Sequence, residues 1–101
     1  MKALEAEMVD RREFMIRARI EAATLDVFIA EEWVIPRRQS GAEEFSDADV
    51  ARAHLIRDLK TDIGVNDEGI GVILHLIDQL HGVRRTLQDV LKRSRPALDQ
   101  D

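Results

Sequence analysis

The sequence predicts a mainly α-helical domain with one small β-hairpin and a long C-terminal helix. Apolar residues recur at helical spacing over most of the chain, which indicates helices packed on a shared core. A proline and a Ser-Gly pair interrupt this pattern within residues 33–45, where a short hairpin fits. Residues 66–95 then carry a heptad repeat of apolar residues, which is typical of a helix that pairs with another helix.

Composition limits the size of the domain and the kinds of site it can hold. A chain of 101 residues with 45% apolar content is expected to form one domain with a modest core. The absence of cysteine excludes disulfides, thiolate nucleophiles and cysteine-bound metals. No apolar run is long enough to span a bilayer, and the segment MKALEAEMVD lacks the apolar stretch of a signal peptide. We therefore expect a cytoplasmic protein without a membrane partner.

Two short helices are expected in the first third of the chain. Residues 1–12 have mixed charge and fit either a strand or a frayed helix. One helix begins at Glu13 and a second near Glu21, and Pro36 ends the second at residue 35 or earlier. Their expected core residues are Phe14, Ala18 and Ile20 in the first helix, and Leu25, Phe28 and Ile29 in the second.

Turn and cap signals divide the middle of the chain. The hairpin is expected to turn at Ser40-Gly41. Ser46 and Asp49 resemble a capping box that opens a third helix. Gly64 suits the left-handed position just after a helix, and Asn66 is expected to cap the last helix. The apolar positions of the third helix include Val50, Ala53, Ile56, Leu59 and Ile63.

The last helix carries an a/d seam, for which two interpretations stay open. The seam either folds back on its own domain or pairs with a second copy, and we favour the dimer because little domain remains to be covered after Gly82. Gly82 weakens the helix by about 1 kcal/mol relative to alanine and is a candidate position for a bend. The predicted dimerisation residues are Ile73, Leu76, Leu80, Val83, Leu87 and Val90.

The order of helix, turn, helix, hairpin and helix is that of a winged helix-turn-helix. The chain is accordingly divided into an N-terminal segment (1–12), a winged helix-turn-helix part (13–65), a C-terminal helical dimerisation part (66–95) and a loose tail after Pro96 (96–101).

The second helix of this motif has the wrong charge for DNA. Residues 21–36 contain four carboxylates and no lysine or arginine, and the whole chain has a net charge of −5. Phosphate contacts need cations, so duplex DNA would be repelled. The acids with apolar groups between them instead suit a basic protein partner, unless they only form a solvated face. The predicted partner-binding residues are Asp26, Val27, Ala30, Glu31 and Glu32.

The hairpin, or wing, is the best argument for nucleic acid. Arg37 and Arg38 lie in it and are a possible partner contact in either interpretation. A basic edge that also includes Arg11, Arg12, Arg17 and Arg19 would support a DNA-binding transcriptional regulator, which stays the alternative function.

Residues 13–92 resemble the MerR-like winged-helix superfamily, and within it the CbpM-type chaperone-modulator family. The resemblance implies an adaptor that binds the J domain of a DnaJ-like co-chaperone, usually of the CbpA type. The resemblance implies that such a protein blocks the co-chaperone's stimulation of the DnaK ATPase and often also the co-chaperone's binding to DNA. It also implies a dimer formed through the C-terminal helices. Arg19 and Glu32 depart from the pattern, because glycine is common at both positions. The matching parts are Glu13-Phe14, Ile20, Leu25, VIP at 34–36, Phe45, the helix with Arg52 to Leu59, and DIGVNDEGIGVILHLIDQL at 62–80.

No pattern of residues predicts an enzyme, a cofactor or a metal site. The three histidines, His54, His75 and His81, lack the spacing of a zinc ligand set. Glycine-rich phosphate loops and nucleophile motifs are also missing. We therefore expect a binding protein without catalytic activity, cofactor or metal.

Overall fold

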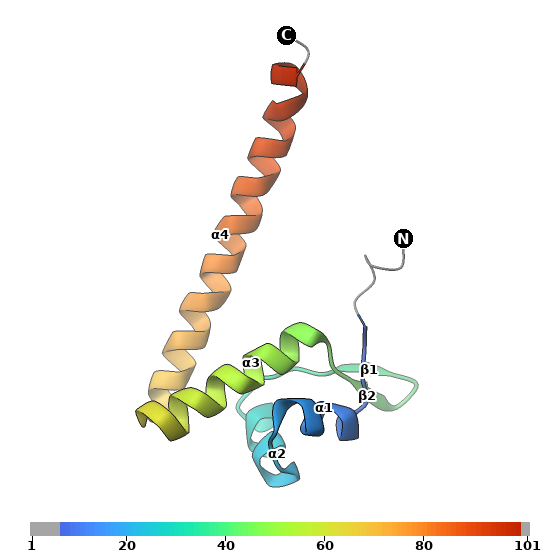
Figure 1. Ribbon diagram of the computed structural model, residues 1–101, viewed down its shortest axis with the longest axis vertical. Coiled ribbons are helices and arrows are strands. Elements are labelled where there is room, and N and C mark those ends of the chain that lie inside the picture. The colour runs from blue at the N-terminus through green and yellow to red at the C-terminus, as the bar shows by residue number, and fades with distance from the viewer. Residues whose placement is uncertain (1–6, 100–101) are drawn as a thin grey trace. The chain divides into compact units, whose positions relative to one another are not determined.

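The computed structural model describes residues 7–99, and the side chains of residues 7–94 (Figure 1). It confirms a mainly helical chain with one two-stranded antiparallel hairpin and a C-terminal helix. The chain divides into unit 1, up to Ile70, and unit 2, from Gly71 onward. This division falls inside the last helix, and not between residues 65 and 66, where the sequence signals place it.

Helix α1 (Arg11–Ala18) starts earlier than its apolar pattern suggests because Asp10 caps it. The Asp10 carboxylate accepts a hydrogen bond from the Glu13 backbone N–H at 2.8 Å. Phe14 and Ala18 are fully buried as predicted, whereas Ile20 follows the helix and is half-buried. Just before the helix, the N–H and carbonyl of Val9 pair with those of Phe45, each at 2.8 Å, which extends the chain beside the hairpin.

Helix α2 (Ala22–Ala30) buries Leu25 and Phe28 and ends well before Pro36. The chain reverses at Glu32, which has a left-handed φ of 62°. This reversal lets the backbone N–H groups of Trp33 and Val34 both donate to the Phe28 carbonyl, at 2.9 and 3.3 Å. The turn, and not the proline, therefore ends the helix.

The wing consists of strands β1 (Arg37–Gln39) and β2 (Ala42–Glu44). Ser40 and Gly41 form the predicted turn, with φ of 51° and 82°. Two consecutive left-handed residues match the right-handed twist of a tight hairpin.

Helix α3 (Asp47–Asp58) opens with the predicted capping box. Ser46 N–H donates to Asp49 at 2.8 Å, and Asp49 N–H donates to the Ser46 hydroxyl at 3.2 Å. After Asp58 the chain makes a π-helical turn, η2 (Leu59–Ile63), which ends at Gly64 in the predicted left-handed conformation. Ile63, expected among the apolar positions of the third helix, lies in this π turn and is 70% exposed. The π turn winds the backbone more widely, so the 3.6-residue spacing does not continue through it.

The core of unit 1 is built from the three helices, the segments next to the wing and the start of α4. The rings of Phe14 and Phe45 stack with centroids 4.2 Å apart, which ties α1 to the end of the wing. The buried apolar residues of unit 1 are Phe14, Ala18, Leu25, Phe28, Trp33, Val34, Phe45, Ala53, Ile56 and Ile70.

Helix α4 (Asp67–Asp99) begins at the predicted cap, where Asn66 accepts a hydrogen bond from the Gly69 N–H at 2.7 Å. It continues without a break through Gly82 and Pro96, so the expected bend and the expected end at Pro96 were both wrong (Figure 1). Glycine only lowers helix propensity, and proline removes one backbone donor, so neither forces a break by itself. Residues 100 and 101 of the predicted tail lie outside the described residues. Among the described residues, no helix is both long and apolar enough to cross a membrane.

Candidate protein-binding surface

The five residues predicted to bind a partner are all exposed at the end of α2. Burial of Leu25 and Phe28 turns the opposite side of this helix outward. Asp26 and Ala30 are four residues apart, as are Val27 and Glu31, so both pairs lie on neighbouring parts of that side. Val27 is 46% exposed, which leaves an apolar group among the carboxylates. We call Asp26, Val27, Ala30, Glu31 and Glu32 the acidic surface.

One carboxylate of the acidic surface already has a cation. The Arg11 guanidinium pairs with Asp26 and also with Glu43 of the wing, at 3.1 Å. The hydrogen bond to Asp26, followed by that to Glu43, raises the pKa of Arg11 above its ordinary value. Among the described residues, no cation pairs with Glu31 or Glu32. The uncompensated charge of the surface therefore lies at its Glu31–Glu32 end.

The two residues that stand where glycine is common, Arg19 and Glu32, both have a left-handed backbone conformation. Arg19 at the turn between α1 and α2 has a φ of 59°, and Glu32 has a φ of 62°. The Arg19 N–H donates to the Ile16 carbonyl at 3.3 Å, and the Ile20 N–H donates to Met15 at 3.2 Å. The turn of the motif thus forms with arginine in the conformation that glycine adopts most easily.

Half of the arginines of the predicted basic edge are paired with carboxylates. Arg38 of the wing pairs with Glu43 at 3.3 Å, and Arg11 pairs with the same carboxylate. Arg17 pairs with Glu13 at 2.9 Å and lies 3.4 Å from Asp47. The remaining arginines of the edge, for which the described residues provide no ion pair, are Arg12, Arg19 and Arg37.

The surrounding unit is acidic as a whole. Residues 7–70 contain fifteen acidic and nine basic residues, a net charge of −6. A polyanion that approaches α2 or the wing would therefore be repelled on average, whereas a basic protein would be attracted.

Sequence reasoning missed the residues that hold the end of the acidic surface in place. Trp33 follows Glu32, is 5% exposed and packs on Phe28 with ring centroids 5.8 Å apart. Arg52 of α3 donates to the Trp33 carbonyl at 2.5 Å. Lys60 of η2 lies 5.6 Å from the centre of the Trp33 ring and 2.5 Å from the Asp67 carboxylate. No local signal identifies Lys60, because the π turn sets its direction.

The histidines take part in no recognisable metal site. His54 Nε2 lies 2.9 Å from the Arg17 carbonyl, which links α3 to α1. Within the described part of the chain, no three potential metal ligands lie close together.

The predicted dimerisation residues form an open apolar face on α4. Leu76, Leu80, Val83, Leu87 and Val90 are between 48% and 65% exposed, and Ile73 is half-buried. Such a row of exposed large apolar groups is unusual on an isolated soluble surface.

Comparison with known proteins supports the helix-turn-helix interpretation. A family model described as MerR HTH family regulatory protein matches residues 9–92, which include both helices of the motif, the wing, α3 and most of α4. A comparison with curated proteins gave no match. The chain therefore belongs to the MerR HTH family of regulatory proteins.

Proposed function

We propose that this protein is a cytoplasmic adaptor that binds the J domain of a DnaJ- or CbpA-like co-chaperone. Binding would inhibit stimulation of DnaK and compete with DNA binding by the co-chaperone. The observation that carries the proposal is the exposed side of α2, which presents carboxylates and apolar groups and has no lysine or arginine.

The chemistry of this surface suits a basic protein better than DNA. DNA affinity depends on cations placed against phosphates, and α2 offers none. Glu31 and Glu32 would instead attract the lysine- and arginine-rich helix by which a J domain docks on DnaK. Val27 and Ala30 add apolar area beside the acids, where contact excludes water and supplies affinity.

The sequence resemblance supplies the identity of the partner. The VIP segment at 34–36 and the segment 62–80 resemble the CbpM-type chaperone-modulator family. Trp33, which directly precedes the VIP segment, follows Glu32 of the acidic surface, and Lys60 contacts both the Trp33 ring and Asp67 of the second segment. The family match over residues 9–92 is compatible with this finer assignment and with other regulatory functions of the family.

DNA-binding transcriptional regulation is the second candidate function. The family match favours it, as do the exposed Arg12, Arg19 and Arg37. These three cations are few, since specific DNA binding commonly uses about 6–10 phosphate contacts. The acidic α2 also lies where a recognition helix would face the bases.

Charge reversal at the end of the acidic surface tests the proposal. In Glu31→Lys/Glu32→Lys the Arg11–Asp26 ion pair stays intact, so the fold should be preserved. We expect association with a J domain to slow by about tenfold at low salt, because exposed charges act mainly as steering groups. DnaK ATPase stimulation by the co-chaperone should return.

The matched control, Asp62→Lys/Asp89→Lys, changes the net charge equally at exposed positions outside the acidic surface. It should inhibit as well as the parent protein. If the Glu31→Lys/Glu32→Lys variant also inhibits equally, with an unchanged association rate, the acidic surface is not the contact. If the parent protein binds no J domain but shifts a DNA duplex in a gel, the second candidate function replaces the first.

A further inference from the structure

Arg11 connects the acidic surface to the wing. One nitrogen of its guanidinium, Nη2, pairs with the Asp26 carboxylate of α2, and the other, Nη1, lies 3.1 Å from the Glu43 carboxylate of β2. Glu43 also pairs with Arg38 of β1 at 3.3 Å. Two carboxylates and two arginines thus form one chain of ion pairs. Within the described residues, Asp26 has Arg11 as its sole cation, whereas Arg11 has two carboxylates.

The two carboxylates that Arg11 joins differ in exposure. The Asp26 side chain is 68% exposed on the outer side of α2, whereas that of Glu43 is 18% exposed. An ion pair between exposed groups is weak and strongly screened by salt, and a partly buried pair is screened less. Arg11 is therefore held mainly by Glu43. Its contact with Asp26 is the one that a cation from another molecule can replace.

We propose that Arg11 competes with a basic partner for Asp26 and thereby limits how tightly the acidic surface binds that partner. This inference rests on the proposed function, because it assumes that a basic segment docks on the acidic surface. While Arg11 holds Asp26, an approaching lysine or arginine meets a neutralised carboxylate with a fixed positive charge beside it. To bind at Asp26, the partner cation has to take the carboxylate from Arg11, which keeps its contact with Glu43.

The competition gives the acidic surface two unequal ends. Glu31 and Glu32 have no cation in the part of the chain that the structure describes, so a partner reaches them without displacing anything. Asp26 lies five residues before Glu31, about 7.5 Å along the helix axis. A basic helix therefore binds best with its cations at the Glu31–Glu32 end and an apolar side chain at Val27. The order of charges along the partner matters as well as their number.

The shape of the arginine side chain allows both contacts at once. A planar guanidinium presents its donors in a fork, whereas a lysine ammonium is a compact point charge. Arg11→Lys keeps the net charge of the protein but is expected to hold one carboxylate at a time. If Arg11 acted only by adding positive charge to unit 1, this exchange would leave partner binding unaltered.

Binding of two basic probes tests the competition. The probes are the J domain of a DnaJ-like co-chaperone and a synthetic amphipathic peptide in which lysines and arginines flank leucines. Each is titrated into the ¹⁵N-labelled full chain, and NMR chemical shifts give the dissociation constant. We expect Arg11→Met to bind the probes about two- to fivefold more tightly at low salt, and Arg11→Lys to show a smaller gain. Added salt should remove the gain.

A control variant separates the competition from a general change of charge. Arg17→Met removes the same charge from α1, but Arg17 pairs with Glu13 and Asp47, outside the acidic surface. It should strengthen binding less than Arg11→Met does. In the Asp26→Asn background the two arginine variants should behave alike, because the contested carboxylate is gone. A larger gain for Arg11→Met that persists in this background overturns the proposal, as does unchanged or weaker binding by Arg11→Met.

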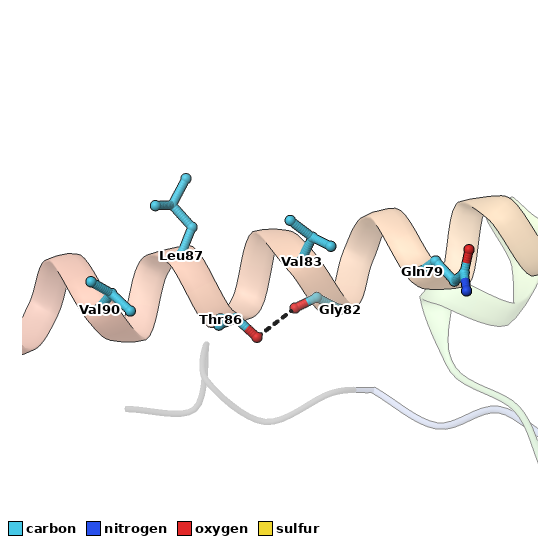
Figure 2. A pocket seen from close by; sticks show the side chains of 6 residues that line it. All are labelled: Gln79, Gly82, Val83, Thr86, Leu87 and Val90. Atoms are coloured by element: carbon cyan, nitrogen blue, oxygen red, sulfur yellow. Dashed lines mark hydrogen bonds between the residues drawn. The ribbon is translucent and has the colours of Figure 1, made fainter.

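The chemical shifts also locate the bound peptide. Its leucines have a second place to bind, a shallow hollow on α4 that has no carboxylate in its lining (Figure 2). Shifts confined to this hollow would overturn the proposal. The residues that line it are Gln79, Gly82, Val83, Thr86, Leu87 and Val90.

The two probes distinguish failure of this inference from failure of the proposed function. If the peptide binding depends on Arg11 as expected and no J domain binds, the competition stands and the J-domain partner is wrong. If Glu31→Lys/Glu32→Lys weakens J-domain binding but Arg11→Met does not strengthen it, the proposed function stands and the competition is wrong. If neither probe binds the parent protein or any variant, both are rejected.

Discussion

In unit 1 the aromatic side chains and several aliphatic ones are buried, whereas in α4 beyond Gly71 most of the large apolar side chains are exposed. Phe14, Phe28 and Phe45 are at most 1% exposed, while Leu76, Leu80 and Leu87 are more than half exposed. The helical spacing of apolar residues is similar in both regions. The difference arises because three helices and a hairpin can cover one another's apolar sides, and a single helix has no second surface of its own to cover its seam.

The charges show the same contrast. In unit 1, ion pairs join segments far apart in sequence, such as Arg11 with Glu43 and Arg17 with Asp47. The basic residues at 84–93 of α4 have no such partners in the described chain. Unit 1 thus pairs part of its charges between distant segments, while the apolar seam of α4 is exposed and its basic residues at 84–93 have no ion pair in the described chain.

The largest difference between the regions should appear when one large side chain is removed from each. Phe45→Ala is expected to lower the free energy of unfolding by about 3–5 kcal/mol, because it empties a fully buried stacked position. Urea unfolding followed by circular dichroism measures the loss. The control Leu91→Ala, at a position 55% exposed, should cost less than about 1 kcal/mol. If both variants lose a similar amount of unfolding free energy, the contrast in burial between the two regions is contradicted.

A charge in the seam should change assembly and leave unit 1 intact. Leu87→Asp is expected to weaken self-association by at least about 100-fold, since pairing would bury an uncompensated carboxylate. Light scattering gives the mass, and Trp33 fluorescence reports whether unit 1 keeps its fold. Gln88→Asp, at the neighbouring exposed position, should leave the mass unchanged. A Leu87→Asp protein with the parent mass would show that the seam is not an interface.

Glycine replacement should have opposite effects in the two regions. Gly82→Ala is expected to raise stability by about 1 kcal/mol, because the position is helical and the added methyl group meets no atom within 4 Å. Gly64→Ala should lower stability by about 1 kcal/mol, because φ is 81° there. Thermal unfolding at one protein concentration compares them. Destabilisation by Gly82→Ala would mean that another chain approaches this glycine closely.

The smallest effect concerns the ion pairs. Arg11→Met removes contacts to Asp26 and Glu43 and should lower stability by at most about 1 kcal/mol, because these groups are partly exposed. Added salt should reduce the difference between variant and parent. Arg84→Met in α4 should have no measurable effect on a dilute sample. If Arg11→Met and Arg84→Met lower stability equally, the charges of α4 also have partners.

Short-range features of the fold could be predicted from the sequence. The Ser46–Asp49 capping box, the left-handed Gly64 and the Asn66 cap each depend on bonds between residues a few positions apart. The Ser40-Gly41 turn is likewise local. The exposed side of α2 also follows from sequence, since burial of Leu25 and Phe28 turns the intervening acids outward.

Long-range pairing and backbone reversals were decided by the tertiary structure. Arg11 reaches Asp26 and Glu43, which are 15 and 32 residues away, so the sequence gives no sign that Arg11 neutralises part of the acidic surface. In the π turn Ile63 is exposed and Lys60 lies at Trp33, although in the sequence Ile63 continues the apolar spacing of the preceding helix. Helix α4 also continues through Gly82 and Pro96, although the local sequence predicted a bend at the glycine and an end at the proline. Local sequence therefore determined caps, turns and helix faces, because their hydrogen bonds close within a few residues. Which charges remain unpaired depended on segments that only the folded chain brings together.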